Sequence, residues 1–316
     1  MRIAIQGAGA MGTYFGGLLA RAGEDVTMLA RGATVEALRA RGLTVKSLRL
    51  GEFTVPVTAL DAAVVSAGSE HLDPVDVVLF CVKTYDTRTA AEGIRRLVGP
   101  DTTVISVQNG VESAERIAEV IGSKALLGGV AQVSALLEAP GVVVARTDPA
   151  TLRFGELSGG LSARTERLAP VFAHAGIVAE PQTDMVRAIW EKFLFICAVS
   201  GVTALTRLPL GPLLAHEETR SLLRGTLDEV ATVARAQGIE LGEDAEDGVF
   251  TLLGRFSPQT QGSMADDLAA GKRLELDALN GAVVRMGQRL GVATPINRVI
   301  TAALTPFRDG APALFS

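Results

Sequence analysis

Residues 2–13 read RIAIQGAGAMGT, an apolar run that leads directly into glycines at positions 7, 9 and 12. The run predicts a buried strand over Arg2–Gln6, followed by a glycine turn and a helix. In such a unit Gly7 permits the tight turn, Gly9 lets the backbone approach a pyrophosphate, and Gly12 allows close helix–strand packing. The stretch therefore predicts dinucleotide binding, with an ordinary glycine-rich turn as the alternative. The predicted cofactor-binding residues of this loop are Gly7, Ala8, Gly9, Ala10, Met11 and Gly12.

The residues after the second predicted strand, Asp25–Ala30, decide which dinucleotide fits. An NAD site usually has Asp or Glu at this point for the ribose 2′-hydroxyl, whereas an arginine accommodates a 2′-phosphate. The chain reads Thr27-Met-Leu-Ala-Arg31-Gly here, with an arginine and no acid. We therefore expect NADP(H), bound by Arg31. A solvated arginine near the start of the next helix is the alternative.

Short β-type runs alternate with helical ones over the first half, which is typical of βαβ units around a parallel sheet. Strands are predicted at 2–6, 25–30, 75–81, 103–107, 142–145, 152–154 and 177–179, with a hairpin at 44–46 and 53–57 and a helix at 162–174. Later helices are predicted near 185–199, 217–237, 244–254, 263–270, 273–290 and 296–306. The sequence thus predicts an α/β protein, with a Rossmann-type doubly wound domain over 1–181 and an all-helical domain over 182–316.

Composition limits the class of protein. The 316 residues are 48% hydrophobic, which excludes an intrinsically disordered chain. A formal charge of −5 without basic runs disfavours nucleic acid as a partner.

The apolar stretches are interpreted as shorter than the roughly 18–20 residues that span a bilayer, and the start has no signal-peptide pattern, so we expect a cytoplasmic protein without a membrane partner. Cys81 and Cys197 lie in apolar runs, and His71, His174 and His216 have no ligand spacing, which predicts a reducing compartment and no bound metal.

Two polar motifs follow apolar strands of the predicted sheet. Lys83 comes after the run that ends at Cys81, and Gln108-Asn109-Gly110 follows the run that ends at Val107. In a doubly wound sheet the cofactor and substrate bind at the carboxyl ends of the strands, which favours Lys83 and Asn109 as site residues. The alternatives are a solvated loop lysine and an ordinary Asn-Gly turn.

Three residues of the helical half are further candidates. The helix over 189–199 is apolar on every face apart from Glu191 and Lys192, so the lysine must snorkel, pair or face a cleft. A desolvated ammonium at a cleft has a lowered pKa and becomes a proton donor near neutral pH. Glu275 lies at the edge of an apolar stripe, where a carboxylate enters a cleft or stays solvated. Ser263 begins a pattern typical of a capping box, and capping is its alternative role.

Taken together, these motifs resemble those of the ketopantoate reductase (2-dehydropantoate 2-reductase) family over nearly the whole chain. The resemblance rests on the glycine loop, Lys83, Gln108-Asn109-Gly110, Trp190-x-Lys192, Ser263-Met264, Glu275-Leu-Asp and Asn280-Gly281. It implies that an N-terminal Rossmann domain binds NADPH and that a helical domain completes the site where a 2-oxo acid is reduced. The resemblance also implies a place in pantothenate biosynthesis.

The resemblance implies roles for individual residues. Lys192 matches the general acid that protonates the carbonyl oxygen, and Glu275 matches a carboxylate that binds substrate and helps to hold the site. Asn109 and Ser263 match substrate and cofactor contacts, and Lys83 matches a lysine near the nicotinamide end of the cofactor.

The chain departs from the family at three positions where asparagine is typical and which here hold Ile196, Ser200 and Leu210. An apolar pocket discriminates weakly among substrates, so a less hydroxylated carbonyl substrate is an alternative, with Ser200 as the remaining polar contact. A β-hydroxyacid-type dehydrogenase and a non-catalytic NADP-sensing protein are further alternatives. The expected partner is a small 2-oxo acid. The sequence does not decide between a monomer and a homodimer.

Overall fold

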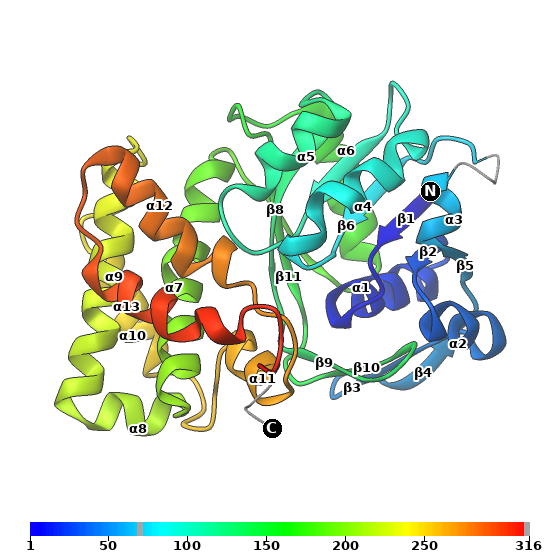
Figure 1. Ribbon diagram of the computed structural model, residues 1–316. Coiled ribbons are helices and arrows are strands. Elements are labelled where there is room, and N and C mark those ends of the chain that lie inside the picture. Colours follow the sequence, from blue (N-terminus) through cyan, green and yellow to red (C-terminus); the bar gives the residue numbers. More distant parts are fainter. Residues whose placement is uncertain (68–71, 313–316) are drawn as a thin grey trace. The chain divides into compact units, whose positions relative to one another are not determined.

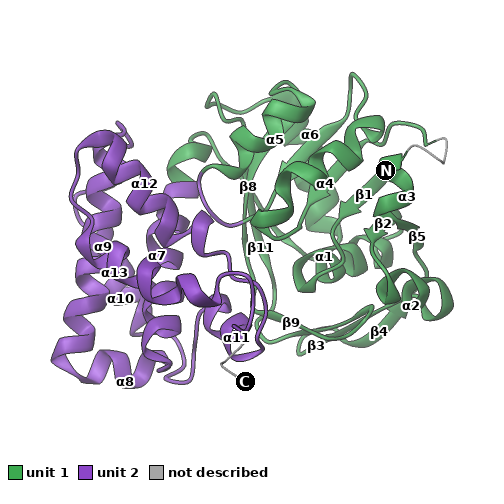
Figure 2. Ribbon diagram, in the orientation of Figure 1, with its two compact units in different colours: residues 1–108, 112–188 green, residues 109–111, 189–316 purple. Residues whose placement is uncertain are grey.

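The computed structural model describes residues 1–67 and 72–312. It divides into two compact units: unit 1 holds residues 1–108 and 112–188, and unit 2 holds residues 109–111 and 189–316 (Figure 2). This division lies beyond residue 181, where the sequence predicted the domain boundary. Met185, which begins the following helix, packs within unit 1, where a Cβ added at Gly155 would lie 3.3 Å from the Met185 Cβ.

Unit 1 contains the doubly wound sheet that the alternating pattern predicted (Figure 1). Its strands are β1 (Arg2–Gln6), β2 (Asp25–Ala30), β5 (Thr58–Asp61), β6 (Val77–Phe80), β7 (Thr103–Ser106), β8 (Leu126–Gln132), β11 (Thr151–Gly155) and β12 (Val178–Pro181). Their order is β12-β11-β8-β7-β6-β1-β2-β5. Strands β8 and β11 pair antiparallel, and the other neighbours pair parallel. The direction of winding reverses between β1 and β6, and this is where ligands bind in sheets of this kind.

Helices cover both faces of this sheet, which is why its central strands are almost wholly apolar. One face carries α1 (Ala10–Arg21), α2 (Ala33–Arg41) and α6 (Ala163–His174), and the other carries α3 (Ala62–Ala67), α4 (Thr87–Ile94) and α5 (Ser113–Ile121). Successive side chains of β1 alternate between the two cores: Ile3 and Ile5 pack on the α1 side and Ala4 on the α4 side.

A smaller sheet also packs against α1 in unit 1. It consists of β3 (Leu43–Ser47), β4 (Gly51–Val55), β9 (Ala135–Ala139) and β10 (Val142–Ala145), in the order β4-β3-β10-β9. Two adjacent glycines permit α1 to approach both sheets. A Cβ at Gly16 would lie 2.7 Å from the Met28 sulfur, and one at Gly17 would lie 2.4 Å from a Val45 methyl. The predicted hairpin is the antiparallel pair β3–β4, whereas the parallel pairing of β3 with β10 was not predicted.

Unit 2 is helical, as predicted (Figure 1). Its elements are α7 (Met185–Thr206, which begins in unit 1), α8 (Leu210–Ala215), α9 (Glu217–Ala236), α10 (Ala245–Leu253), α11 (Ser263–Ala269), α12 (Asn280–Leu290), α13 (Pro295–Leu304) and the 3-10 turns η3 (Leu276–Ala278) and η4 (Thr305–Phe307). One predicted helix, 273–290, was too long: α12 starts at Asn280 because Leu279 has φ −106° and ψ −108°.

Helix α7 corrects one further expectation. By length and composition it could cross a membrane, since it has 22 residues and a window with a mean hydropathy of 1.6. However, 67% of that window is buried inside the structure, and Phe193, Leu194 and Cys197 are almost wholly buried. This burial is typical of the core helix of a soluble protein.

Candidate active site

The glycine loop joins β1 to α1, and its first and third glycines are required by packing. Gly7 has φ +105°, and a Cβ there would lie 2.8 Å from a Val82 methyl and 3.0 Å from the Val82 nitrogen. A Cβ at Gly12 would lie 1.9 Å from the carbonyl oxygen of Gly7. A larger residue at either position would push α1 away from the sheet, so both glycines serve the close strand–turn–helix approach that the motif predicts.

Gly9 differs from its two neighbours because space surrounds it. Among the described residues, none other than Gly9 and its chain neighbours has a heavy atom within 4 Å of a Cβ placed at Gly9, and the residue is the N-cap of α1. The first N–H groups of a helix have no partner inside the helix, and the helix dipole favours an anion there. The loop therefore combines open backbone with donors for a pyrophosphate, and Ala8, Ala10 and Met11 complete it. These features fit a dinucleotide.

Arg31 follows β2 directly, where the sequence placed it. Its guanidinium donates a 2.9 Å hydrogen bond to the carboxylate of Asp86, in the 3-10 turn η1 (Thr84–Asp86) that follows β6. Both side chains remain accessible, with 57% of the Arg31 side chain and 32% of the Asp86 side chain exposed. Sequence reasoning missed Asp86, because an acid 55 positions further along the chain gives no local signal of its proximity to Arg31.

Lys83 also lies at this edge of the sheet, as the residue before η1. The ends of β6 and β7 are held together by Gln108, whose side-chain amide donates 2.9 Å hydrogen bonds to the Val82 carbonyl and to the Thr87 hydroxyl. The carboxyl ends of β1, β2 and β6 thus bring the glycine loop, Arg31 and Lys83 to one edge of unit 1.

Asn109 belongs to unit 2, together with the segment that carries Glu275. The Asn109 amide donates a 3.3 Å hydrogen bond to a carboxylate oxygen of Glu275. The next residue, Gly110, has φ +86°, and a Cβ there would lie 2.8 Å from the Ala278 carbonyl oxygen. The turn at 109–111 therefore packs closely on the segment at 275–278. Glu275 is 5% exposed and precedes η3, so it is buried rather than solvated on a helix surface.

Lys192 lies on α7 and is partly buried. Burial lowers the pKa of its ammonium to about 8, and the nearby carboxylate of Glu275 acts in the opposite direction and raises it. Desolvation disfavours the charged form of a lysine, while an opposite charge favours it. The result is a lysine that exchanges a proton near neutral pH and lies within the field of a buried carboxylate.

Ser263 and Ser200 occupy different surroundings. Ser263 is exposed at the start of α11, and Gly262 rather than Ser263 is the N-cap, so the capping role was wrong. Ser200 is fully buried on α7, and its hydroxyl has no hydrogen-bond partner among the described residues. A Cβ at Gly262 would lie 2.6 Å from that hydroxyl oxygen. Ile196, one turn after Lys192, is partly buried, and Leu210 is almost wholly buried.

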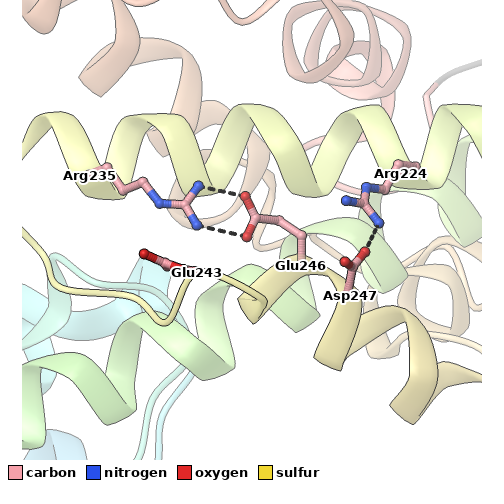
Figure 3. A pocket seen from close by; sticks show the side chains of 5 residues that line it. All are labelled: Arg224, Arg235, Glu243, Glu246 and Asp247. Carbon is pink, nitrogen blue, oxygen red and sulfur yellow. Dashed lines mark hydrogen bonds and ion pairs between the residues drawn. The ribbon is translucent and has the colours of Figure 1, made fainter.

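A charged pocket of about 280 Å³ lies elsewhere in unit 2, between α9 and α10 (Figure 3). Its lining residues are Arg224, Arg235, Glu243, Glu246 and Asp247. Arg235 donates hydrogen bonds of 2.6 and 2.8 Å to the two oxygens of Glu246, and Arg224 is paired with Asp247. The Arg235 guanidinium holds the pKa of the Glu246 carboxyl below its usual value. These arginines are paired with carboxylates that join two helices, which is a structural role.

Within the described ranges, no three His, Cys, Asp or Glu side chains are grouped so as to hold a metal ion; His71 lies outside those ranges. Burial raises the pKa of the Cys81 thiol to about 12 and also raises that of Cys197 well above its usual value. Both thiols are therefore protonated at neutral pH. Neither is suited to act as a nucleophile.

The fold and these residues define a class: a Rossmann-type oxidoreductase with a helical second unit. Two family models match, "Ketopantoate reductase PanE/ApbA" over residues 3–159 and "Ketopantoate reductase PanE/ApbA C terminal" over residues 184–307. The chain belongs to the ketopantoate reductase family. Members of this family are NADP-dependent oxidoreductases that act on CH–OH groups.

Individual relatives agree with this assignment. A 2-dehydropantoate 2-reductase of Caulobacter vibrioides is 35% identical over 241 residues, which cover 76% of this chain and 80% of the relative. The crystal structure of a PanE/ApbA family ketopantoate reductase from Ralstonia eutropha has a TM-score of 0.88 and 34% identity, and 98% of each chain is covered. A D-mandelate dehydrogenase solved with NADH and anilino(oxo)acetate has a TM-score of 0.88 and 25% identity, again with 98% of each chain covered.

Proposed function

We propose that this chain reduces a 2-oxo acid to the corresponding 2-hydroxy acid with NADPH, with 2-dehydropantoate as the first candidate substrate. The observation that carries the proposal is the partly buried Lys192 beside the buried carboxylate of Glu275, which Asn109 holds by a hydrogen bond. A lysine with a pKa of about 8 is a suitable general acid for a carbonyl group. The test is oxidation of NADPH, followed at its nicotinamide absorbance, with 2-dehydropantoate.

The glycine loop and two basic side chains would bind the cofactor. Gly7, Gly9 and Gly12 shape the loop whose backbone N–H groups would bind the pyrophosphate. Arg31 would bind the 2′-phosphate, and Lys83 would contact the cofactor near its nicotinamide end. When bound, the cofactor supplies a hydride to the carbonyl carbon.

Unit 2 would supply the proton and hold the substrate. The Lys192 ammonium donates its proton to the carbonyl oxygen, and its charge stabilises the alkoxide that develops there. Glu275 accepts a hydrogen bond from the substrate and keeps the charged form of Lys192 populated. Asn109 orients Glu275 and contacts substrate or cofactor, and the exposed Ser263 is a further substrate contact. The contact expected of Ser200 does not fit its complete burial beneath Gly262.

A second candidate is a relative that acts on a less hydroxylated 2-oxo acid. The aliphatic side chain of Ile196 lies one turn from Lys192 on α7, and Leu210 is also aliphatic. The similarity to a D-mandelate dehydrogenase solved with anilino(oxo)acetate adds support, since that name denotes an oxo acid without a hydroxyl substituent. Aliphatic side chains offer no hydrogen bond to a substrate hydroxyl.

This candidate makes a prediction about substrate preference. We expect Ile196→Asn to raise kcat/KM for 2-dehydropantoate relative to an unhydroxylated branched 2-oxo acid by about tenfold, because the new amide can bond the hydroxyl. The measurement is kcat/KM for both acids in both proteins, with Ile196→Val as the control that keeps the site apolar. A wild-type protein that already prefers 2-dehydropantoate strongly would contradict this second candidate and favour the first.

The glycine loop makes another prediction. Gly9→Ala should fold normally, because space surrounds its Cβ, but should bind NADPH at least about tenfold more weakly, because the methyl group lies where the pyrophosphate approaches the backbone. Gly12→Ala should instead lower the thermal stability of unit 1, because its Cβ would overlap the Gly7 carbonyl oxygen. Thermal denaturation and NADPH titration distinguish the two effects. Unchanged NADPH affinity in a folded Gly9→Ala variant would refute the role of the loop.

The remaining expectations are also proposals. We infer a cytoplasmic enzyme that binds a small 2-oxo acid and has no nucleic-acid or membrane partner. Whether the enzyme is a monomer or a homodimer is left undecided. A β-hydroxyacid-type dehydrogenase would oxidise a hydroxy acid in preference to reducing the oxo acid. A non-catalytic NADP-sensing protein would bind NADPH tightly and turn over no member of a broad panel of carbonyl compounds.

A further inference from the structure

Arg31 and Asp86 form an ion pair at the carboxyl edge of the larger sheet in unit 1. The Arg31 Nη2 atom lies 2.9 Å from the Asp86 carboxylate oxygen. Arg31 follows β2, and Asp86 closes the turn that follows β6. The residue after β2 is the one that normally meets the 2′ position of the adenosine ribose. The ion pair therefore places a positive and a negative group together at that position.

The two side chains favour different cofactors. A guanidinium binds the 2′-phosphate of NADPH, whereas a carboxylate accepts a hydrogen bond from the 2′-hydroxyl of NADH and repels the phosphate. The segment at the end of β2 contains no acid of its own, and Asp86 supplies one from the turn after β6, a strand that β1 separates from β2. Asp86 accepts a hydrogen bond from one of the five N–H groups of the Arg31 guanidinium, so Arg31 retains donors for a phosphate.

We propose that Asp86 is a specificity-determining residue for the cofactor, and that this chain therefore accepts NADH as well as NADPH. The proposal rests on the proposed function, because it assumes that the glycine loop and Arg31 bind a nicotinamide dinucleotide. The carboxylate of Asp86 accepts a hydrogen bond from the ribose 2′-hydroxyl of NADH. In the NADPH complex the same carboxylate shares Arg31 with the 2′-phosphate and opposes the negative charge of that phosphate.

Asp86 can be changed without disturbing the fold. Its side chain is about one-third exposed, and its turn is closed by a backbone hydrogen bond of 3.0 Å from the Asp86 N–H to the Lys83 carbonyl. Asp86→Asn keeps the size of the side chain and a carbonyl oxygen that can accept from Arg31; it removes the charge and replaces the second oxygen with an NH2 donor.

The experiment measures dissociation constants of NADPH and NADH for the wild-type protein, Asp86→Asn and a control, Glu92→Gln. Glu92 lies on α4 in the same unit and is paired with Arg88 rather than with Arg31. Glu92→Gln therefore removes one negative charge and leaves the ion pair of Arg31 with Asp86 intact. We expect Asp86→Asn to bind NADPH about fivefold more tightly and NADH about fivefold more weakly, since exposed charge pairs contribute up to about fivefold in affinity. The control should change neither constant by more than about twofold.

Equal changes in both constants, no change in Asp86→Asn, or the same changes in Glu92→Gln would overturn the assignment. Undetectable binding of NADH to the wild-type protein would also overturn it. Failure of the proposed function has a different signature: in that case Arg31→Ala leaves the NADPH affinity unchanged, or the wild-type protein binds neither dinucleotide. Higher ionic strength should reduce the effect of Asp86→Asn on NADPH, because salt screens exposed charges.

Discussion

Replacing Lys192 with alanine should lower kcat by about 10²- to 10⁴-fold, the usual contribution of a general acid, while NADPH still binds. The physical reason is that the variant can neither protonate the carbonyl oxygen nor stabilise the negative charge that develops on it. The measurement is kcat on the best 2-oxo acid, together with an NADPH titration. The loss should appear in kcat more than in the dissociation constant of NADPH.

Lys192→Arg is the informative companion variant. Arginine keeps the positive charge but does not release its proton near neutral pH, so it separates charge from proton donation. We expect Lys192→Arg to be slightly faster than Lys192→Ala. Its activity should no longer decrease as the pH rises through about 8, the pKa of Lys192 in the wild-type protein. Near-normal turnover in Lys192→Ala would refute the role of this lysine and return the non-catalytic alternative to consideration.

Replacing Glu275 with glutamine should lower kcat/KM by about 100-fold and move the pH profile. The carboxylate raises the pKa of Lys192, which burial has lowered to about 8, so its removal should bring that pKa further down. Reduction requires the protonated lysine, and activity is therefore lost as the pH rises through the pKa of Lys192. In Glu275→Gln the alkaline fall in kcat/KM should begin at a lower pH than in the wild-type protein.

A neighbouring acid provides the control for this experiment. Asp277 is exposed and lies two positions further along the same segment, so Asp277→Asn removes a similar charge without changing the buried carboxylate. We expect its pH profile to match that of the wild-type protein, because an exposed charge is screened by solvent. An unchanged profile in Glu275→Gln would mean that this carboxylate does not act on Lys192.

The sequence alone was sufficient for the class of fold and for the glycine loop. The apolar strand, the glycines at 7, 9 and 12, and the alternation of strands and helices are local patterns, and local sterics leave few other structures for them. The helical second half was equally readable from its periodicity. Boundaries were less accurate: the helix expected over 273–290 begins only at Asn280, because a break at Leu279 has no signature in the pattern of apolar residues.

The tertiary structure decided which polar groups meet. Glu275 accepts a hydrogen bond from Asn109, a residue separated from it by 166 positions, and Asp86 pairs with Arg31 across 55 positions. Neither pairing has a sequence pattern, because such contacts arise only when strands and turns far apart in the chain pack together. The same holds for the state of Lys192. Its identity and position could be read from the sequence, but its lowered pKa depends on burial and on a distant carboxylate, which only the folded chain supplies.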